Sequence, residues 1–441
     1  MFVEPWKLRA RFARSLSEMY GNEVPAYRTL VEVSHAVNAD VVRRHGADAE
    51  RLGSLDRVTA ERHGAIRLGT PRELAQVARI FGAMGMFPVG YYDLRDAAPT
   101  PVPVVSTAFR PVDEDELARN PFRVFTSVLA TSDRRFFDAA LQARLEAFLD
   151  ARELFGPELL ALADRAEADG GLDADDADRF VALATQAFEL SRAPVDGPWY
   201  RELEAISSVA ADIGGVASTH VNHLTPRVLD IDDLYARMQT RGIKMIDAIQ
   251  GPPRWKGPDV LLRQTSFRAL AEPRAFRDAD GVVRDTALRV RFGEVEARGI
   301  ALTRTGRARY DELIGQPVEV WNARLPHTEH GLAAADLAYF TFHATDRPRD
   351  EQTPTELAAL LAGGWVTAEP IVYEDFLPRS AAGIFQSNLT SAGRHQTGQQ
   401  HAALDADWMA GVLDRELADP FDLYDAQRER SLDALDVLAR S

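Results

Sequence analysis

The sequence contains no cysteine. This absence excludes disulfides, thiolate nucleophiles, and zinc or iron–sulfur sites built on thiolates. Any metal site must therefore use histidine and carboxylate ligands. A chain without disulfides also suits a reducing compartment, and we expect a cytoplasmic protein.

Long apolar runs are missing as well. No apolar stretch approaches the 18 residues that a membrane-spanning helix needs, and residues 1–6 (MFVEPW) show no basic segment leading into an apolar one. We therefore expect neither a membrane span nor a membrane partner.

Basic residues are fewer than acidic residues. The sequence has 51 Lys and Arg residues and 67 Asp and Glu residues, which gives a formal net charge of -16. This balance argues against nucleic acid and anionic membranes as partners, although a locally positive pocket for an acidic substrate stays possible. Hydrophobic residues make up 46% of the 441, enough for a large core and more than one domain.

The chain does contain an internal sequence repeat. Residues 61–72 (ERHGAIRLGTPR) and 218–227 (STHVNHLTPR) each combine a short strand-like run, a histidine near its start and a Thr-Pro-Arg turn. A helical pattern follows each copy. Self-similarity of this kind indicates a duplicated structural unit.

Each copy opens a module with the order βαβββ. In the first, Thr70 and Glu73 form a capping box with Pro71 at the first helical position, and in the second Asp230 caps the helix. The first module is predicted as strand 62–68, helix 71–84 and strands 86–94, 102–112 and 122–130. The second is predicted as strand 220–224, helix 230–241 and strands 244–249, 260–267 and 288–298.

These modules predict an α+β protein of five segments. They are a helical N-terminal segment (1–60), the first module (61–131), a helical insertion (132–212), the second module (213–300) and a mixed C-terminal region that closes the active site (301–441). In the last segment we expect a helix at 306–314, strands at 338–343 and 366–373, and a mostly helical ending from 405 to 440.

Side-chain alternation along the strands groups the polar residues. In the first copy His63 and Arg67 point the same way, with the small Ala65 between them. Arg67 lies about 13 Å along the strand from His63. A guanidinium there suits bidentate pairing with a carboxylate.

In the second module His220 and Asn222 share one face of a strand and His223 points to the other, while Glu294 and Glu296 share a face. If the two modules close around a cavity, His63, His220 and Glu294 converge in it. Two imidazoles and one carboxylate suit a ferrous oxygenase with open coordination positions.

The same residues carry a family resemblance. The paired modules resemble the vicinal oxygen chelate superfamily, and residues 292–296 (FGEVE) are similar to the Phe-x-Glu strand that supplies the carboxylate ligand in 4-hydroxyphenylpyruvate dioxygenase. Residues 63–67, 220–227 and 292–299 resemble the 2-oxoadipate dioxygenase/decarboxylase family more closely. Residues 376–378 (FLP) with 380–385 (SAAGIF) are similar to the C-terminal loop of that family. The resemblance spans roughly residues 60 to 390.

The resemblance implies a half-open barrel of two paired βαβββ modules around a metal site. It implies that Fe(II) is held by His63, His220 and Glu294, with most ligands in the second module, and that Arg67 binds a substrate carboxylate. It also implies that the backbone around Arg379 and Ser380 helps to fix the substrate. His223 stays an alternative to His220, which we favour because its distance from the Thr-Pro-Arg turn is nearer to that of His63.

The implied reaction converts 2-oxoadipate and O2 to (R)-2-hydroxyglutarate and CO2, a step of lysine catabolism. The partners are then a 2-oxo dicarboxylic acid and O2, and Glu296 could assist the ligands. Two other hypotheses use the same residues. One is a metal-dependent isomerase or ring-cleaving dioxygenase on the same fold, and the other is a non-catalytic protein that binds a small molecule without metal.

Overall fold

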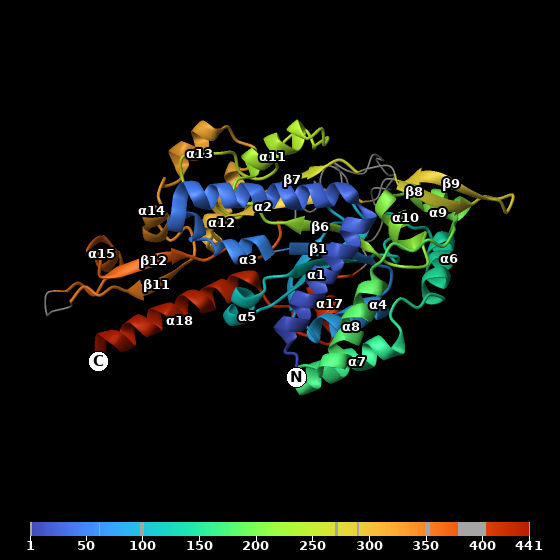
Figure 1. The fold of residues 1–441 in the computed structure, drawn as a ribbon, viewed down its shortest axis with the longest axis horizontal. Helices are drawn as coiled ribbons and strands as arrows, with labels where there is room; N and C mark the ends of the chain where they lie inside the picture. Colours follow the sequence, from blue (N-terminus) through green and yellow to red (C-terminus); the bar gives the residue numbers. More distant parts are fainter. Residues whose placement is uncertain are drawn as a thin grey trace.

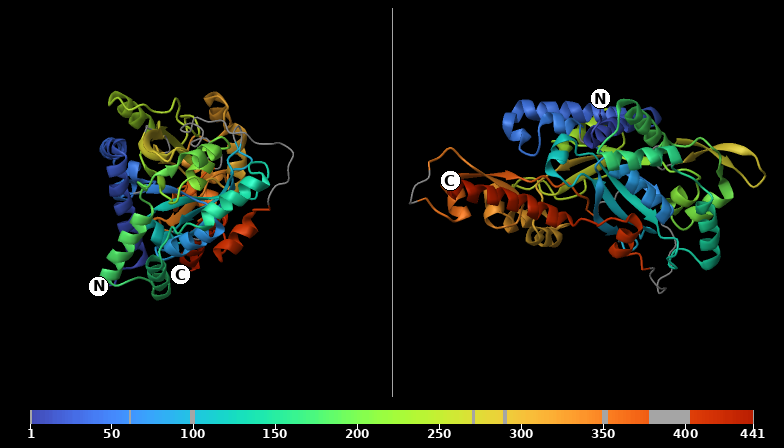
Figure 2. Two further views of the ribbon diagram at one scale, coloured as in Figure 1. Left: turned by 90° about the vertical axis from the view of Figure 1, so that its right-hand side faces the viewer. Right: turned by 90° about the horizontal axis from the view of Figure 1, so that it is seen from below.

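The computed structural model describes residues 2–60, 62–97, 101–269, 272–288, 291–348, 353–377 and 403–440. The molecule is elongated, with its main sheet in the middle, a β-hairpin at one end and the C-terminal helix with a two-stranded sheet at the other (Figures 1 and 2). It is an α+β protein with several mixed sheets. Arg379 and Ser380 lie outside the described residues.

The first module forms as predicted. It consists of β1 (Arg62–Leu68), α4 (Pro71–Gly82), β2 (Phe87–Asp93), β3 (Val104–Arg110) and β4 (Arg123–Leu129), with a short helix α5 (Glu114–Arg119) added between β3 and β4. The capping box is present, because the Glu73 amide donates to Thr70 Oγ1 over 3.2 Å and the Glu73 carboxylate accepts from the Thr70 amide over 3.2 Å. This box fixes the turn directly after β1.

The second module departs from the pattern in two places. Its elements are β6 (Val221–Pro226), α11 (Ile231–Thr240), β7 (Leu262–Phe267) and β10 (Gly293–Arg298). Residues 244–249, all of them described, make a single isolated bridge to β7, between Met245 and Phe267, in place of the predicted strand. The predicted strand 288–298 is two strands, because β9 (Val283–Leu288) pairs with β8 (Glu272–Arg277) in a hairpin that the sequence pattern did not predict.

The two modules meet edge to edge. The five-stranded sheet has the order β2-β3-β4-β1-β6, in which β1 runs parallel to β4 and antiparallel to β6. A parallel bridge between Arg227 and Glu296 places β10 beside the end of β6, and β10 pairs antiparallel with β7. Pairing directions in the second module therefore repeat those of the first. Three neighbouring strands thus come from both modules, β1 from the first and β6 and β10 from the second.

Helices surround this sheet. The N-terminal segment holds α1 (Pro5–Glu23), α2 (Pro25–His45), η1 (Gly46–Glu50) and α3 (Leu55–Ala60). Between the modules lie α6 (Ala139–Asp150), α7 (Pro157–Asp169), α8 (Ala174–Ala187), the short strand β5 (Val195–Asp196), α9 (Gly197–Glu204) and α10 (Ser208–Gly214). α1 packs on α8, and α4 packs on α7. The predicted helical character of both segments is confirmed.

The C-terminal region is mixed, as expected. It contains α12 (Arg304–Leu313), α13 (Val318–Arg324), α14 (Glu329–Ala334), β11 (Phe340–Ala344), α15 (Leu357–Ala362), β12 (Val366–Pro370), α17 (Ala406–Leu413) and α18 (Pro420–Arg440). β11 and β12 form a separate two-stranded antiparallel sheet, with α15 between them in the sequence. The division of the chain into five domains stays a prediction.

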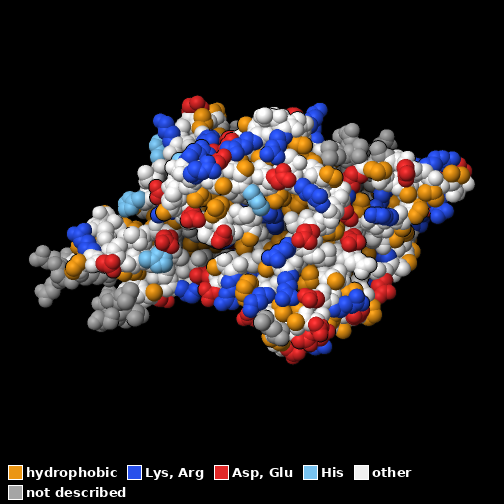
Figure 3. Space-filling view, viewed as in Figure 1, with side chains coloured by type: hydrophobic (Ala, Val, Ile, Leu, Met, Phe, Trp, Pro, Cys, Tyr) orange, Lys and Arg blue, Asp and Glu red, His pale blue; other side chains and the backbone are white. Residues whose placement is uncertain are grey.

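The surface carries both signs of charge. On the face shown in Figure 3, basic and acidic side chains are interspersed rather than gathered into one broad patch. Within the described residues, none of the helices has the length and apolar character that crossing a bilayer demands.

Candidate metal centre

Three neighbouring strands each contribute one potential metal ligand. His63 lies on β1, His223 on β6 and Glu294 on β10, and all three side chains are buried. One ligand atom from each lies within 4.8 Å of those of the other two. Adjacent strands lie about 4.8 Å apart, so one side chain from each of three strands can reach a common point.

The pairing of β1 with β6 decides which histidine joins His63. Ala65 stands opposite His223, and directly opposed residues project to the same face of a sheet. His63, two residues before Ala65, shares that face. A register shift follows this pair, because Ile66 pairs with Val221 and leaves Asn222 as the extra residue of a bulge.

The structure thus differs from the expected convergence, because it places His223 rather than His220 beside His63 and Glu294. His220 precedes β6 and lies among other polar groups, with its Nε2 atom 3.2 Å from Asn222 Nδ2 and 3.4 Å from Asp212 Oδ1. Alternation had shown that His220 and His223 point to opposite faces, but the face that meets His63 depends on the strand pairing.

Aromatic rings enclose the two histidines. The His63 and His223 ring centroids are 5.5 Å apart, and Phe292 stacks on His223 at 5.0 Å. Phe376 meets the His63 ring edge-on at 5.0 Å. Next to Phe292, a Cβ on Gly293 would lie 1.9 Å from the Phe267 ring, so only glycine fits between Phe292 and Glu294.

The charge states in this pocket suit a cation. Burial lowers the pKa of His63 and lowers that of His223 well below its ordinary value, so both imidazoles are neutral and can donate a lone pair. Burial, together with the nearby Glu296, raises the pKa of Glu294 well above its ordinary value. A buried carboxyl and two neutral imidazoles form a donor set that fits a divalent metal.

Arg67 lies in a second polar group nearby. Its Nη1 atom donates to Asp212 Oδ2 over 2.5 Å, and Asn222 Nδ2 donates to the same oxygen over 2.9 Å. The backbone carbonyl of Arg67 accepts from Thr219 Oγ1 over 2.8 Å. Arg67 is thus buried and held in place on the strand that carries His63.

Two polar residues of this region were missed in the sequence. Asp212 lies on α10 in the helical insertion, and no pattern in the sequence links it to β1. Arg298 lies two residues after Glu296 on β10, and its Nε atom donates to Glu296 Oε1 over 2.6 Å. The alternation that grouped Glu294 with Glu296 could also have identified Arg298.

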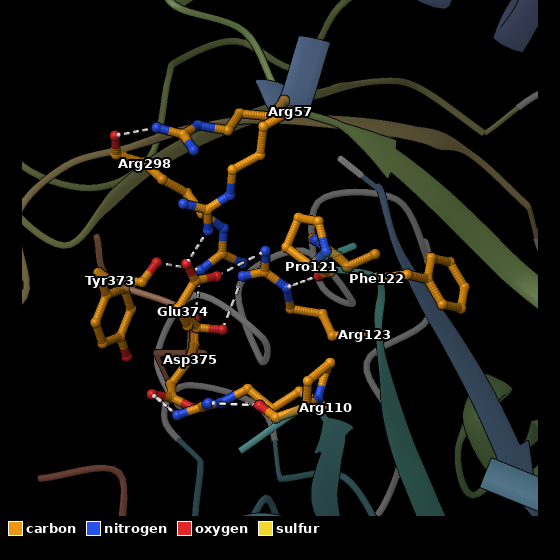
Figure 4. A network of polar contacts seen from close by, with 12 residues as sticks. Arg57, Arg110, Pro121, Phe122, Arg123, Arg298, Tyr373, Glu374 and Asp375 are labelled. Atoms are coloured by element: carbon orange, nitrogen blue, oxygen red, sulfur yellow. Dashed lines mark hydrogen bonds and ion pairs between the residues drawn. The ribbon is translucent and has the colours of Figure 1, made fainter. Parts of the chain in front are cut away.

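A network of buried charges holds the segment 373–377 through its first three residues (Figure 4). Phe376, the next residue, contacts the His63 ring. Arg110 on β3 makes a two-pronged ion pair with Asp375, with contacts of 2.7 and 3.1 Å. Arg123 on β4 lies 3.0 Å from Glu374 Oε2. The segment is therefore fixed to two strands of the first module just before the chain reaches Arg379 and Ser380.

The fold and the site together define an α+β protein with several mixed sheets and a buried candidate metal centre on three neighbouring strands, β1, β6 and β10. Residues 12–388 match the family model described as 2-oxoadipate dioxygenase/decarboxylase. The chain belongs to this family.

Proteins of similar sequence match this chain over nearly its whole length. The 2-oxoadipate dioxygenase/decarboxylase of Mycobacterium tuberculosis is 60% identical over 432 residues, covering 97% of this chain and 98% of the relative. The Escherichia coli protein of the same name is 40% identical over 450 residues, covering 96% and 97%. The crystal structure of the Pseudomonas putida hydroxyglutarate synthase in complex with 2-oxoadipate is 40% identical, covers 98% of each chain and superposes with a TM-score of 0.85.

Proposed function

We propose that this protein is an Fe(II)-dependent dioxygenase/decarboxylase that converts 2-oxoadipate and O2 to (R)-2-hydroxyglutarate and CO2. The observation that carries the proposal is the buried group of His63, His223 and Glu294, with ligand atoms within 4.8 Å of one another. Family membership over residues 12–388 supports the substrate.

The proposed metal is Fe(II). Two neutral imidazoles and one carboxylate on one side of the ion leave the other coordination positions open, which is the ligand set of ferrous oxygenases. We place the ion in a half-open barrel made of the two modules. His63, His223 and Glu294 would hold the ion, which would supply a binding position for a 2-oxo acid and the activation of O2.

The residues of the chain supply position and a dry cavity. We propose that Arg67 binds the distal carboxylate of the substrate. Asp212 holds the Arg67 guanidinium from one side over 2.5 Å and fixes its direction before substrate arrives. The backbone around Arg379 and Ser380 is proposed to complete the carboxylate site, as the family resemblance implies.

The aromatic side chains around the histidines keep water away. The Phe376 ring contacts the His63 ring and the Phe292 ring contacts the His223 ring, each with the ring centroids 5.0 Å apart. Water exclusion strengthens the charge contacts inside the site and limits side reactions. The reaction would be a cytoplasmic step of lysine catabolism.

Oxygen consumption with metal analysis tests this function. After anaerobic loading with Fe(II), the wild-type protein should consume O2 and release CO2 in equal amounts on 2-oxoadipate. His223→Ala should bind less than a tenth of the wild-type iron and show no uptake. His220→Ala is the matched control, because it removes a buried histidine of the same strand region and should keep stoichiometric iron.

Other outcomes decide between the functions. Stoichiometric metal without O2 uptake on any 2-oxo acid would favour an isomerase or ring-cleaving dioxygenase. Absence of stoichiometric metal would favour a non-catalytic binding protein. Loss of iron in His220→Ala but not in His223→Ala would restore the ligand set first expected from the sequence.

A further inference from the structure

We infer that Glu296 is a positioning residue that fixes the orientation and tautomer of His63 for the metal, and that Arg298 couples this contact to the segment 373–377. The inference rests on the proposed function, since it assumes that His63 binds a metal. It assigns a role to a carboxylate that is not itself among the three ligands.

The first step is the contact between the two side chains. His63 Nδ1 lies 3.2 Å from Glu296 Oε1, and both side chains are almost fully buried, with exposures of 3% and 1%. Nδ1 lies within reach of the carboxylate, although the two atoms are not aligned for a hydrogen bond, and Nε2 is then the ring atom left for a metal. Metal-bound histidines commonly direct their second nitrogen at a carboxylate, which raises the basicity of the ring and sets its rotation.

The second step is the pairing of Glu296 with Arg298. Arg298 donates from Nε to Oε1 over 2.6 Å and from Nη2 to Oε2 over 3.0 Å. Both carboxylate oxygens of Glu296 thus act as hydrogen-bond acceptors, and an acceptor beside Nδ1 favours the His63 tautomer that carries a proton on Nδ1.

The third step is what holds Arg298. Its Nη1 atom donates to the carbonyl oxygens of Tyr373 over 2.7 Å and Asp375 over 3.0 Å (Figure 4). Its guanidinium also lies 5.8 Å from the centroid of the Phe376 ring, and that ring contacts His63. The contacts thus form a closed circuit from His63 through Glu296, Arg298 and residues 373–376 back to His63.

The circuit has a functional consequence. The segment 373–377 leads directly into the region of Arg379 and Ser380, which is proposed to contact substrate. Its position is transmitted to the metal ligand by two routes, one through the Arg298–Glu296 pair and one through the Phe376 ring. A shift of this segment would therefore alter how His63 presents Nε2.

The chain offers a matched control for a purely structural ion pair. Glu73 pairs with Arg152 in nearly the same way, with contacts of 2.6 and 2.9 Å and both side chains at most 4% exposed. Glu73 contacts no histidine in the described structure. Neutralising it should destabilise the fold without changing the metal site.

The experiment measures metal affinity and the His63 ring proton. Co(II), whose visible absorption reports coordination, is titrated into metal-free full-length wild type, Glu296→Gln, Glu296→Ala, Arg298→Lys and Glu73→Gln. We expect Kd for Co(II) to rise by about 10- to 100-fold in Glu296→Ala, the range found for carboxylates behind a metal-bound histidine. Glu296→Gln and Arg298→Lys should give smaller rises, and Glu73→Gln should stay within about twofold.

Proton NMR of the Co(II) protein supplies the second readout. The wild type should show a strongly shifted, exchangeable resonance from His63 Nδ1–H, which should move or disappear in Glu296→Gln but stay in place in Glu73→Gln. If Glu296 variants are insoluble, Arg298→Lys decides the question with the same two readouts.

Three results would overturn the inference. One is an unchanged Kd and resonance in the Glu296 variants, or in Arg298→Lys if that variant alone is soluble. Another is an equal loss of affinity in Glu73→Gln. The third is a wild type that binds no stoichiometric metal, which defeats the proposed function as well and is thereby distinguished from the first two.

Discussion

At the residue scale, His220 and His223 are three positions apart but occupy different environments. His223 faces His63 and Glu294, whereas His220 contacts Asp212 and Asn222. Burial, and the guanidinium groups of Arg291, Arg274 and Arg67, outweigh the attraction of Asp212 and lower the pKa of His220 to about 4. The His220 ring is therefore neutral in the folded protein at neutral pH.

This difference predicts a pH dependence of stability. In the unfolded chain His220 takes up a proton below its ordinary pKa of 6.5, but in the folded protein only near 4. Between these pH values the unfolded state binds more protons than the folded state. The contribution of neutral His220 to the stability of the fold is therefore complete above pH 6.5 and is lost as the pH falls towards 4. Between pH 7 and pH 5, the free energy of unfolding should fall by about 2 kcal/mol more in wild type than in His220→Gln.

Urea denaturation of the metal-free protein at the two pH values measures this difference. The two proteins share all other titrating groups, so these cancel in the comparison. Parallel losses of stability in wild type and His220→Gln would show that His220 is not a buried neutral side chain.

The sequence located the type of site but not every residue in it. His63, Arg67 and Glu294 were identified because each lies on a strand whose alternation can be counted. The choice between His220 and His223 required the partner of β6, which a single strand does not reveal. Asp212 reaches Arg67 from a helix of the insertion, a contact between residues 145 positions apart.

At the element scale, buried ion pairs join segments that are distant in the sequence. Asp375 pairs with Arg110 on β3 and also accepts from the Tyr424 hydroxyl on α18. Burial alone would lower the pKa of Arg110, but the nearby Asp375 carboxylate raises this pKa above its ordinary value. Through Asp375, the segment that contains Phe376 is thus attached both to the sheet and to the last helix.

Breaking this pair should be costly. Asp375→Asn leaves the Arg110 charge buried without its carboxylate, and we expect a loss of about 3 kcal/mol in the free energy of unfolding. The control is Asp164→Asn, which breaks an ion pair with Arg79 whose side chains are 39% and 55% exposed. That exposed pair should contribute less than about 1 kcal/mol.

Denaturant titrations of the two variants and the wild type give these values. Similar small losses in both variants would mean that the 373–377 segment is held by other contacts.

Elements of the first module were predictable because local signals agreed with the fold. The Thr70 capping box marked the start of α4, and apolar runs marked its four strands. The second module was harder. Residues 244–249 have a strand-like composition but pair with β7 at a single position, and the β8–β9 hairpin is polar, since its β8 strand buries just Arg274 and Phe276.

At the scale of the whole molecule, the candidate ligands connect the two copies. His63 belongs to the first module, and His223 and Glu294 belong to the second. A metal ion bound by all three would join the copies across the β1–β6 boundary in the folded state, while the unfolded chain has no such arrangement.

Metal should therefore stabilise the entire fold. At a free concentration 100 times Kd, a ligand that binds only the folded state adds about 2.7 kcal/mol to the free energy of unfolding. We expect Fe(II) or Co(II) under anaerobic conditions to raise Tm of the wild type by several degrees and to leave Tm of His223→Ala unchanged. Thermal unfolding with and without chelator measures the shift, and an equal shift in both proteins would place the bound metal elsewhere.

The unequal division of the candidate ligands between the copies also limits how the chain can be divided. The first module supplies His63, and the second supplies His223 and Glu294. Either module produced alone would hold at most two of the three ligands, so a split protein would regain the complete ligand set only when its two halves reassemble.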